Sequence, residues 1–126
     1  MIKGIGQIAI TVKDLDRAVG FYRDALGLKF LFQPGNLAFF DCGGIRLMLT
    51  PPEKPTELYS SILYLRVDDI ESAHQELASR GVAFEATPHL IARMDTYDLW
   101  MAFFRDTESN LLALMCEKGR ATSSGG

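Results

Sequence analysis

The sequence has few of the features that would mark a membrane, secreted or nucleic-acid-binding protein. No stretch approaches the roughly 18 apolar residues that a membrane span requires, and the opening MIKGIGQ lacks the apolar segment of a signal peptide. Basic residues do not cluster, and 13 Lys and Arg stand against 16 Asp and Glu, for a net charge of -3. Because phosphate binding needs clustered positive charge, we expect no binding to nucleic acid. Because the apolar segments are missing, we expect a cytoplasmic protein that does not bind a membrane.

Reactive arrangements are also missing. The sequence shows no Ser-His-Asp or Cys-His pattern, no phosphate-binding glycine loop and no CxxC motif, so covalent catalysis has no support. The two cysteines are Cys42, in a glycine-rich turn, and Cys116, at the end of an expected strand. Nothing in the sequence pairs them, and we expect both to be free thiols.

What the sequence does contain is an internal duplication. Residues 8–18 (IAITVKDLDRA) align with residues 63–73 (LYLRVDDIESA), and residues 38–40 (AFF) recur at 102–104. Repeats of this length are supersecondary units that cannot bury their apolar faces alone. The 126 residues, 48% of them hydrophobic, suit one compact domain.

Both halves predict the order strand, helix, strand, strand, strand. Asp14 and Asp69 stand at N-cap positions, and Gly27 and Gly81 supply the left-handed residue that ends each helix. We expect an α+β fold in which two tandem βαβββ modules form a curved eight-stranded mixed sheet around a central cavity, with the helices on the outer face. The expected strands are 5–12, 28–32, 37–41, 45–50, 61–67, 82–86, 98–105 and 111–116, and the expected helices are 15–26 and 70–80.

In this interpretation residues 1–118 are a single domain. Module one covers 1–53, a linker covers 54–60, and module two covers 61–118. The small polar residues of 119–126 indicate a flexible tail.

The chain resembles the vicinal oxygen chelate superfamily, which includes glyoxalase I, extradiol dioxygenases and the bleomycin resistance proteins. The resemblance rests on IAITVKDLDRAVGFYRDALGLKFLF, LYLRVDDIESAHQELASRGVAF and WMAFFRDTESNLLALM. It implies the duplicated fold, and homodimers are common among its members. In metal-using members one divalent ion chelates two neighbouring substrate oxygens and acts as a Lewis acid. The ligand positions that the resemblance implies are Gln7, Met48, Ile62 and Ala113.

These four side chains depart from the family pattern. Only Gln7 suits a hard or borderline ion, because Ile62 and Ala113 have no donor atom and the Met48 thioether prefers soft ions. We therefore predict that the usual metal site is absent and that the protein needs no cofactor. Whether the protein is an enzyme stays open.

Strand alternation predicts a cavity face that is aromatic, Met-containing and sparsely polar. Such linings suit a small organic ligand, although the same aromatic and Met residues could instead form a closed core. The expected ligand-binding residues are Gln7, Phe40, Arg46, Met48, Ile62, Tyr64, Arg66, Trp100, Phe104 and Ala113.

Two arginines on this face need a partner. An arginine facing a closed cavity is costly unless it meets a carboxylate or an anionic ligand. Either a protein partner such as Asp41 or Asp98 neutralises each of Arg46 and Arg66, which is the preferred interpretation, or the ligand is acidic. His89, in an expected loop at 87–97, either lies over the cavity mouth or is solvated.

Three functions are compatible with this sequence. The first is a metal-free member of the bleomycin resistance type, which binds an aromatic or amphiphilic molecule in its central cavity. The second is a lyase, isomerase or dioxygenase, such as a glyoxalase I type enzyme, that holds a divalent metal with Gln7 and a displaced ligand set. The third is a structural or regulatory homodimer without a ligand.

Overall fold

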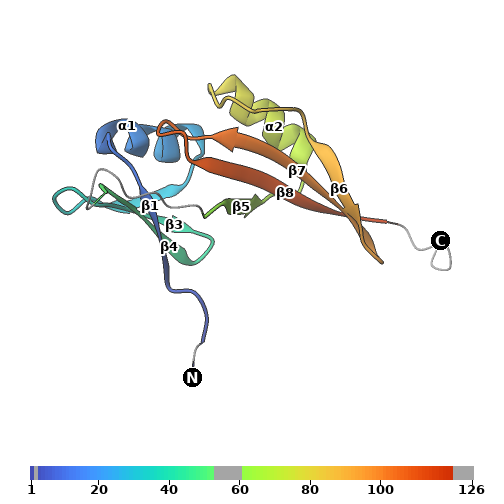
Figure 1. Cartoon of the computed structure of the whole chain (residues 1–126), viewed down its shortest axis with the longest axis horizontal. Coiled ribbons are helices and arrows are strands. Elements are labelled where there is room, and N and C mark those ends of the chain that lie inside the picture. Colours follow the sequence, from blue (N-terminus) through green and yellow to red (C-terminus); the bar gives the residue numbers. More distant parts are fainter. Residues whose placement is uncertain (2, 53–60, 121–126) are drawn as a thin grey trace. The chain divides into compact units, whose positions relative to one another are not determined.

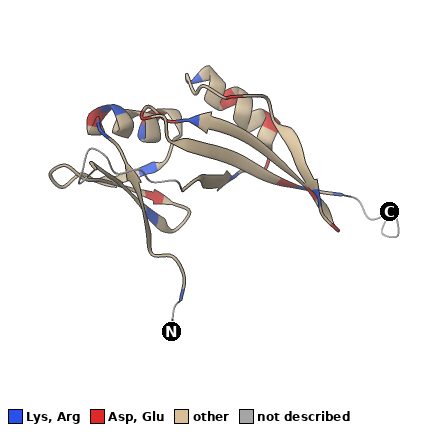
Figure 2. Ribbon diagram, in the orientation of Figure 1, with Lys and Arg blue, Asp and Glu red and all other residues tan. Residues whose placement is uncertain are grey.

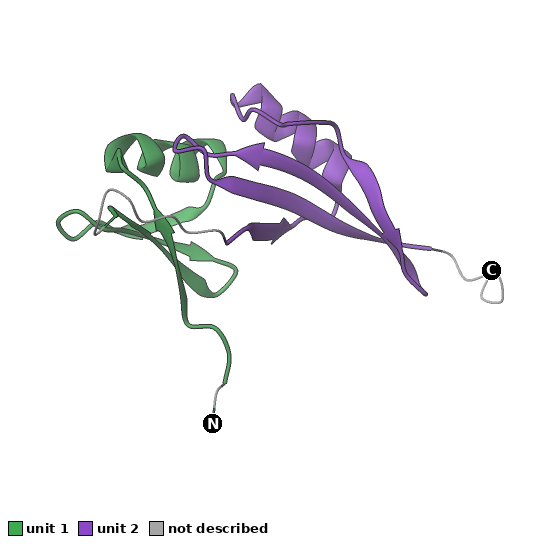
Figure 3. Cartoon of the chain, in the orientation of Figure 1, with its two compact units in different colours: residues 1–60 green, residues 61–126 purple. Residues whose placement is uncertain are grey.

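The computed structural model describes residues 1, 3–52 and 61–120. The chain forms two compact units, Met1–Ser60 and Ser61–Gly126 (Figure 3). Each unit contains one four-stranded mixed sheet with a helix packed on one face (Figure 1). The predicted linker 54–60 and residues 121–126 of the predicted tail lie outside the described residues.

Unit 1 follows the predicted order of elements. In its sheet the strand order is β1-β4-β3-β2, with β1 and β4 parallel and the other neighbours antiparallel. The elements are β1 (Gln7–Thr11), α1 (Leu15–Gly20), the π-helical turn η1 (Phe21–Ala25), β2 (Lys29–Phe32), β3 (Ala38–Cys42) and β4 (Ile45–Thr50).

The first helix begins where the sequence predicts. Asp14 is its N-cap, and its Oδ1 accepts a hydrogen bond from the backbone N–H of Arg17 at 3.2 Å. The predicted helix is nevertheless divided, because the backbone N–H of Leu26 bonds to the carbonyl of Phe21 at 3.0 Å, five residues back. Gly27, with φ of 73°, then ends it in the left-handed conformation that glycine adopts without strain.

Aromatic packing joins this helical segment to the sheet. Tyr22 and Phe40 are both 0% exposed, with ring centroids 6.1 Å apart, and Phe30 meets Phe40 edge-on at 5.5 Å. Leu47, opposite Phe40 in the register, and Leu49 are also buried. These side chains form the core between the helix and the sheet of unit 1.

Unit 2 repeats the same topology, with the strand order β5-β8-β7-β6 and one parallel pair, β5 with β8. Its elements are β5 (Leu63–Arg66), α2 (Ile70–Ser79), β6 (His89–Arg93), β7 (Tyr97–Arg105) and β8 (Leu111–Gly119). The α+β class and the duplication are therefore confirmed. The joining of the two sheets around a central cavity stays a prediction.

The predicted strand 82–86 is wrong, and β6 lies instead in the segment expected to be a loop. Phe84 forms only an isolated bridge with Phe104. The hydrophobic character of this segment comes from burial rather than strand pairing, since Val82 is 4% exposed and Phe84 lies 4.3 Å from the His74 ring. The pairing with β7 begins at His89 and contains a bulge before Ala92.

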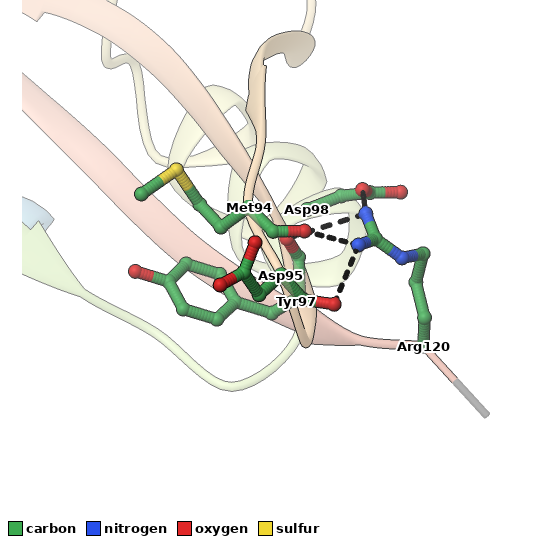
Figure 4. Close-up of polar contacts among 5 residues, drawn as sticks. All are labelled: Met94, Asp95, Tyr97, Asp98 and Arg120. Atoms are coloured by element: carbon green, nitrogen blue, oxygen red, sulfur yellow. Dashed lines mark hydrogen bonds and ion pairs between the residues drawn. The ribbon is translucent and has the colours of Figure 1, made fainter. Parts of the chain in front are cut away.

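The predicted start of the flexible tail is also wrong, because β8 extends to Gly119 and Arg120 makes ordered contacts (Figure 4). The Arg120 guanidinium donates to the Asp98 carboxylate and to the carbonyls of Met94, Asp95 and Tyr97. It thereby closes the turn between β6 and β7. A guanidinium can bond to one carboxylate and three carbonyls at once because its plane holds five N–H donors in fixed directions.

Charges of both signs are interspersed along the described chain (Figure 2). The ion pairs Arg80–Glu76 and Arg105–Glu85 illustrate this mixing, and all four of their side chains are substantially exposed. Such pairs contribute little to stability. None of the described helices is long and apolar enough to cross a membrane.

We expect Phe40→Ala to lower the free energy of unfolding by about 3–5 kcal/mol, because it removes a fully buried ring from contact with Tyr22 and Phe30. Urea denaturation measures the loss. Phe32→Ala is the matched control, since Phe32 is 47% exposed. An equal loss for both variants would contradict the assignment of Phe40 to the core.

We expect Arg120→Ala to lower the free energy of unfolding by about 1 kcal/mol, the net worth of a hydrogen-bonded charge, because the Arg120 side chain is 35% exposed and partly screened. Amide hydrogen exchange should also quicken at Met94, which bonds to Tyr97 across the turn. Arg93→Ala is the control, an equal charge change on exposed Arg93 of β6. Unchanged exchange at Met94 would refute a role for Arg120 in closing this turn.

Candidate functional site

The helix-free face of unit 1, the side of its sheet opposite the helix, carries a polar row across all four strands. Gln7 of β1 is paired with Arg46 of β4, Arg46 with Asp41 of β3, and Asp41 with Lys29 of β2. Paired residues in neighbouring strands point to the same face of a sheet. The row therefore contains two positive groups, one negative group and one amide.

An apolar row lies next to it, one side-chain step along the strands. Ala9 is paired with Met48, Met48 with Phe39, and Phe39 with Phe32. The Phe32 and Phe39 rings stack with centroids 4.7 Å apart. Phe32 is 47% exposed, whereas Phe39 is 9% exposed beneath its neighbours. The helix-free face of unit 1 is thus amphiphilic.

Gln7 and Arg46 are joined by a hydrogen bond within the polar row. The Arg46 Nε donates to the Gln7 Oε1 at 2.9 Å, and the Gln7 Nε2 donates weakly to the Met48 Sδ at 3.8 Å. The Arg46 Cζ also lies 5.5 Å from the Phe39 ring centroid, within the range of a cation–π contact. Two contacts thus orient the Arg46 guanidinium.

The preferred ion pairs for the two arginines are wrong within the part of the chain that the structure describes. Asp41 lies opposite Arg46 in the register but forms no ion pair with it, and Asp98 pairs with Arg120. Among the described residues Arg66 has no ion pair either. The contacts of Arg46 to described residues are those with Gln7 and Phe39.

Three predicted site residues lie on the helix-covered faces instead. Phe40 packs against Tyr22, and Phe104, 0% exposed, lies 5.3 Å from the Phe84 ring. Trp100 lies beneath Lys118, whose Nζ is 4.3 Å from the Trp100 ring centroid and bonds to Glu71 of α2. The assignment of these three to the ligand-facing side is wrong.

Their neighbours Phe39, Met101 and Phe103 occupy the helix-free faces. Strands β3 and β7 are apolar on both sides, so hydrophobicity alone could not distinguish the faces. The charged residues Asp41 and Arg105 could have identified the helix-free face from the sequence. Each stands two positions after an aromatic residue, Phe39 or Phe103, and residues two apart in a strand point to the same face.

The helix-free face of unit 2 is aromatic at its centre. Tyr64, Ala113 and Phe103 lie side by side on neighbouring strands, and the Tyr64 and Phe103 rings meet edge-on at 6.3 Å. His89 of β6 lies 6.5 Å from the Phe103 ring. The predicted face of Tyr64 and Ala113 is therefore correct, while Ile62 precedes β5.

The next row on this face is basic at both ends. It runs from Arg66 through Met115 and Met101 to His89. Arg66 therefore also lies on its predicted face. The His89 Nδ1 is 3.3 Å from the carbonyl of Thr87, a contact that constrains the ring.

The remaining groups of chemical interest have structural explanations. Burial, and secondarily the charge of Asp41, raise the pKa of the Cys42 thiol, which makes it a poor nucleophile at neutral pH.

Asp106 is buried and accepts hydrogen bonds from Glu108 and Asn110 in the turn before β8. Within residues 1, 3–52 and 61–120, no group of three or more His, Cys, Asp or Glu side chains could hold a metal ion.

The family model of the Glyoxalase/Bleomycin resistance protein/Dioxygenase superfamily matches residues 4–114. The chain belongs to this superfamily. The match covers both units, in agreement with the duplicated topology.

Sequence relatives agree with this membership. The uncharacterised protein YraH of Bacillus subtilis is 27% identical over 123 residues, covering 86% of this chain and 94% of YraH. The metallothiol transferase FosB of Staphylococcus haemolyticus is 43% identical over 49 residues, which cover 39% of this chain and 35% of FosB. The FosB likeness is therefore confined to a segment of each protein.

Solved structures show the same fold at low identity. Lactoylglutathione lyase from Agrobacterium tumefaciens has a TM-score of 0.75 at 23% identity, covering 90% of this chain and 93% of that one. A superfamily member from Sphaerobacter thermophilus has a TM-score of 0.76 at 23% identity, covering 92% and 98%. These similarities establish the superfamily fold and leave the chemistry to the site residues.

Proposed function

We propose that this superfamily member binds a small aromatic or amphiphilic molecule on the helix-free faces of its sheets and needs no metal to do so. The observation that carries the proposal is the pair of adjacent rows in unit 1, one polar and one apolar. Ligand sites combine apolar lining with a few polar groups that set orientation. The aromatic centre of the face in unit 2 is a second surface of this kind.

The donor chemistry of unit 1 supports binding without the usual metal. Gln7 is the only family ligand position with a hard donor atom, and its Oε1 already accepts a hydrogen bond from Arg46 at 2.9 Å. A guanidinium so close repels a divalent cation. Met48 offers a thioether, which prefers soft ions. The residues at the usual ligand positions of unit 1 therefore do not fit the metal.

The corresponding positions of unit 2 do not fit a metal ion either. Ile62 and Ala113 carry no donor atom, and Ala113 is 0% exposed. We accordingly propose no reaction step through a metal. A bound molecule would be recognised and held, as expected for a protein that sequesters its ligand.

The alternative is a metal-dependent lyase, isomerase or dioxygenase of the glyoxalase I type with a displaced ligand set. The observation in its favour is the amide oxygen of Gln7, which would have to exchange its bond with Arg46 for a bond to the ion. His89 is the other candidate donor, and its Nε2 forms no hydrogen bond with a described residue. Cytoplasmic location and homodimer formation remain proposals beside either function.

We expect a neutral planar compound such as 2-naphthol to bind the intact protein, and Phe32→Ala to weaken that binding about fivefold. The reason is the loss of an exposed aromatic contact, which is worth roughly 1 kcal/mol. Isothermal titration calorimetry measures the change. Leu90→Ala is the control, because Leu90 is 37% exposed and pairs with Trp100 on the helix-covered face of unit 2. Equal weakening in both variants, or no binding to the intact protein, would refute the proposal.

We expect the protein, after equilibration with Zn²⁺, Ni²⁺ or Mn²⁺ and removal of excess, to retain far less than one ion per chain. Arg46 stands beside Gln7, which among the family ligand positions is the one with a hard donor atom, and the charge of Arg46 opposes a cation. Inductively coupled plasma mass spectrometry measures the content. One equivalent of metal that disappears in Gln7→Ala, together with hemithioacetal turnover, would establish the enzyme alternative instead.

A further inference from the structure

We propose that the ligand of unit 1 is a planar organic acid whose carboxylate binds Arg46 while its ring system rests on the neighbouring apolar row. This inference rests on the proposed function and adds the charge of the ligand and the residue that recognises it. Three observations support an acidic ligand: the contacts of Arg46, the charges of the polar row and the position of the apolar row.

Arg46 is held in place without being neutralised. Its Nε is engaged by Gln7 and its planar group lies near the Phe39 ring, while its terminal nitrogens have no partner among the described residues. These nitrogens form the fork that binds a carboxylate with two parallel hydrogen bonds. Because Gln7 and Phe39 already restrict the side chain, less conformational entropy is lost when the acid binds.

The charges along the polar row favour an anion. Arg46 and Lys29 flank Asp41, so the row carries an excess of one positive charge. Asp41 lies directly opposite Arg46 in the register but forms no ion pair with it. A cationic ligand would face the exposed Arg46 and Lys29, whereas an acid gains a charge-assisted hydrogen bond.

The apolar row limits the shape of the rest of the molecule. Ala9 is exposed, Met48 is partly exposed, and Phe32 is 47% exposed at the far end of the row. Side chains that follow each other on one face of a strand are about 7 Å apart, and neighbouring strands are about 5 Å apart. A carboxylate attached directly to one or two fused rings spans the distance from Arg46 to this row.

The repeat shows that this arrangement belongs to unit 1 alone. The positions of unit 2 that correspond to Gln7, Arg46 and Asp41 are occupied by Ile62, Leu111 and Arg105. Arg105 is engaged by Glu85 at 2.8 Å. Arg17, exposed on α1 of unit 1, carries the same charge on the helix side of that unit, so it is a suitable control.

The test compares three ligands by calorimetry at pH 7: 2-naphthoate, the uncharged 2-naphthamide, and acetate. For the intact protein we expect 2-naphthoate to bind at least tenfold more tightly than 2-naphthamide and acetate not to bind measurably. Arg46→Gln should abolish the preference for the acid, and Arg46→Lys should restore part of it, because lysine keeps the charge but not the fork. Arg17→Gln makes the same charge change and should leave the preference intact.

The outcomes separate this inference from the proposed function. If 2-naphthamide binds as tightly as 2-naphthoate, the inference is overturned while small-molecule binding stands. If Arg46→Gln keeps the preference, or Arg17→Gln removes it as fully, the site is not at Arg46 and the inference also fails. If neither naphthalene compound binds the intact protein, both proposals fail. Thermal melting of each variant verifies that the fold is unchanged.

Discussion

The register between β1 and β4 determines which side chains lie together on the helix-free face of unit 1. Their parallel pairing places Gln7 beside Arg46 and Ala9 beside Met48, and the antiparallel pairing of β3 adds Asp41 and Phe39 to the same two rows. A shift of one residue would turn each side chain to the other face. The packing of Tyr22 against Phe40 opposes such a shift, because it commits Phe40 to the helix side.

The same pairing supports the proposal that this chain binds its ligand without the metal of its superfamily. Gln7 occupies a position that would face an ion, but the side chain paired with it is a permanent cation. Arginine cannot be deprotonated in a protein, so no ordinary change of pH removes that repulsion. A guanidinium in this place suits an anion.

The two units share a topology and have diverged on their helix-free faces. Unit 1 has a charged row beside an apolar row, whereas unit 2 has Tyr64 and Phe103 in contact at its centre. Their helix-covered sides have remained alike, with an aromatic residue of the third strand buried in each, Phe40 and Phe104. Packing constrains the covered side, and the helix-free side is where residues can change without loss of the core.

The sequence by itself determined the duplication, the α+β class, the N-caps Asp14 and Asp69, and the helix end at Gly27, because these depend on local preferences and on repeated patterns. It also placed Gln7, Arg46, Met48, Tyr64, Arg66 and Ala113 on the helix-free faces of their sheets, while their part in ligand binding stays a prediction.

Only the tertiary structure decided the faces of Phe40, Trp100 and Phe104, the position of β6, and the partners of the charged side chains. Strands that are apolar on both sides give no alternation to interpret, and a bulged edge strand such as β6 has a weak pattern. The contacts of Arg46 with Gln7 and Phe39, and of Arg120 with Asp98, join residues far apart in the chain. Such contacts depend on strand register and on where a turn brings the chain back, which no local pattern specifies.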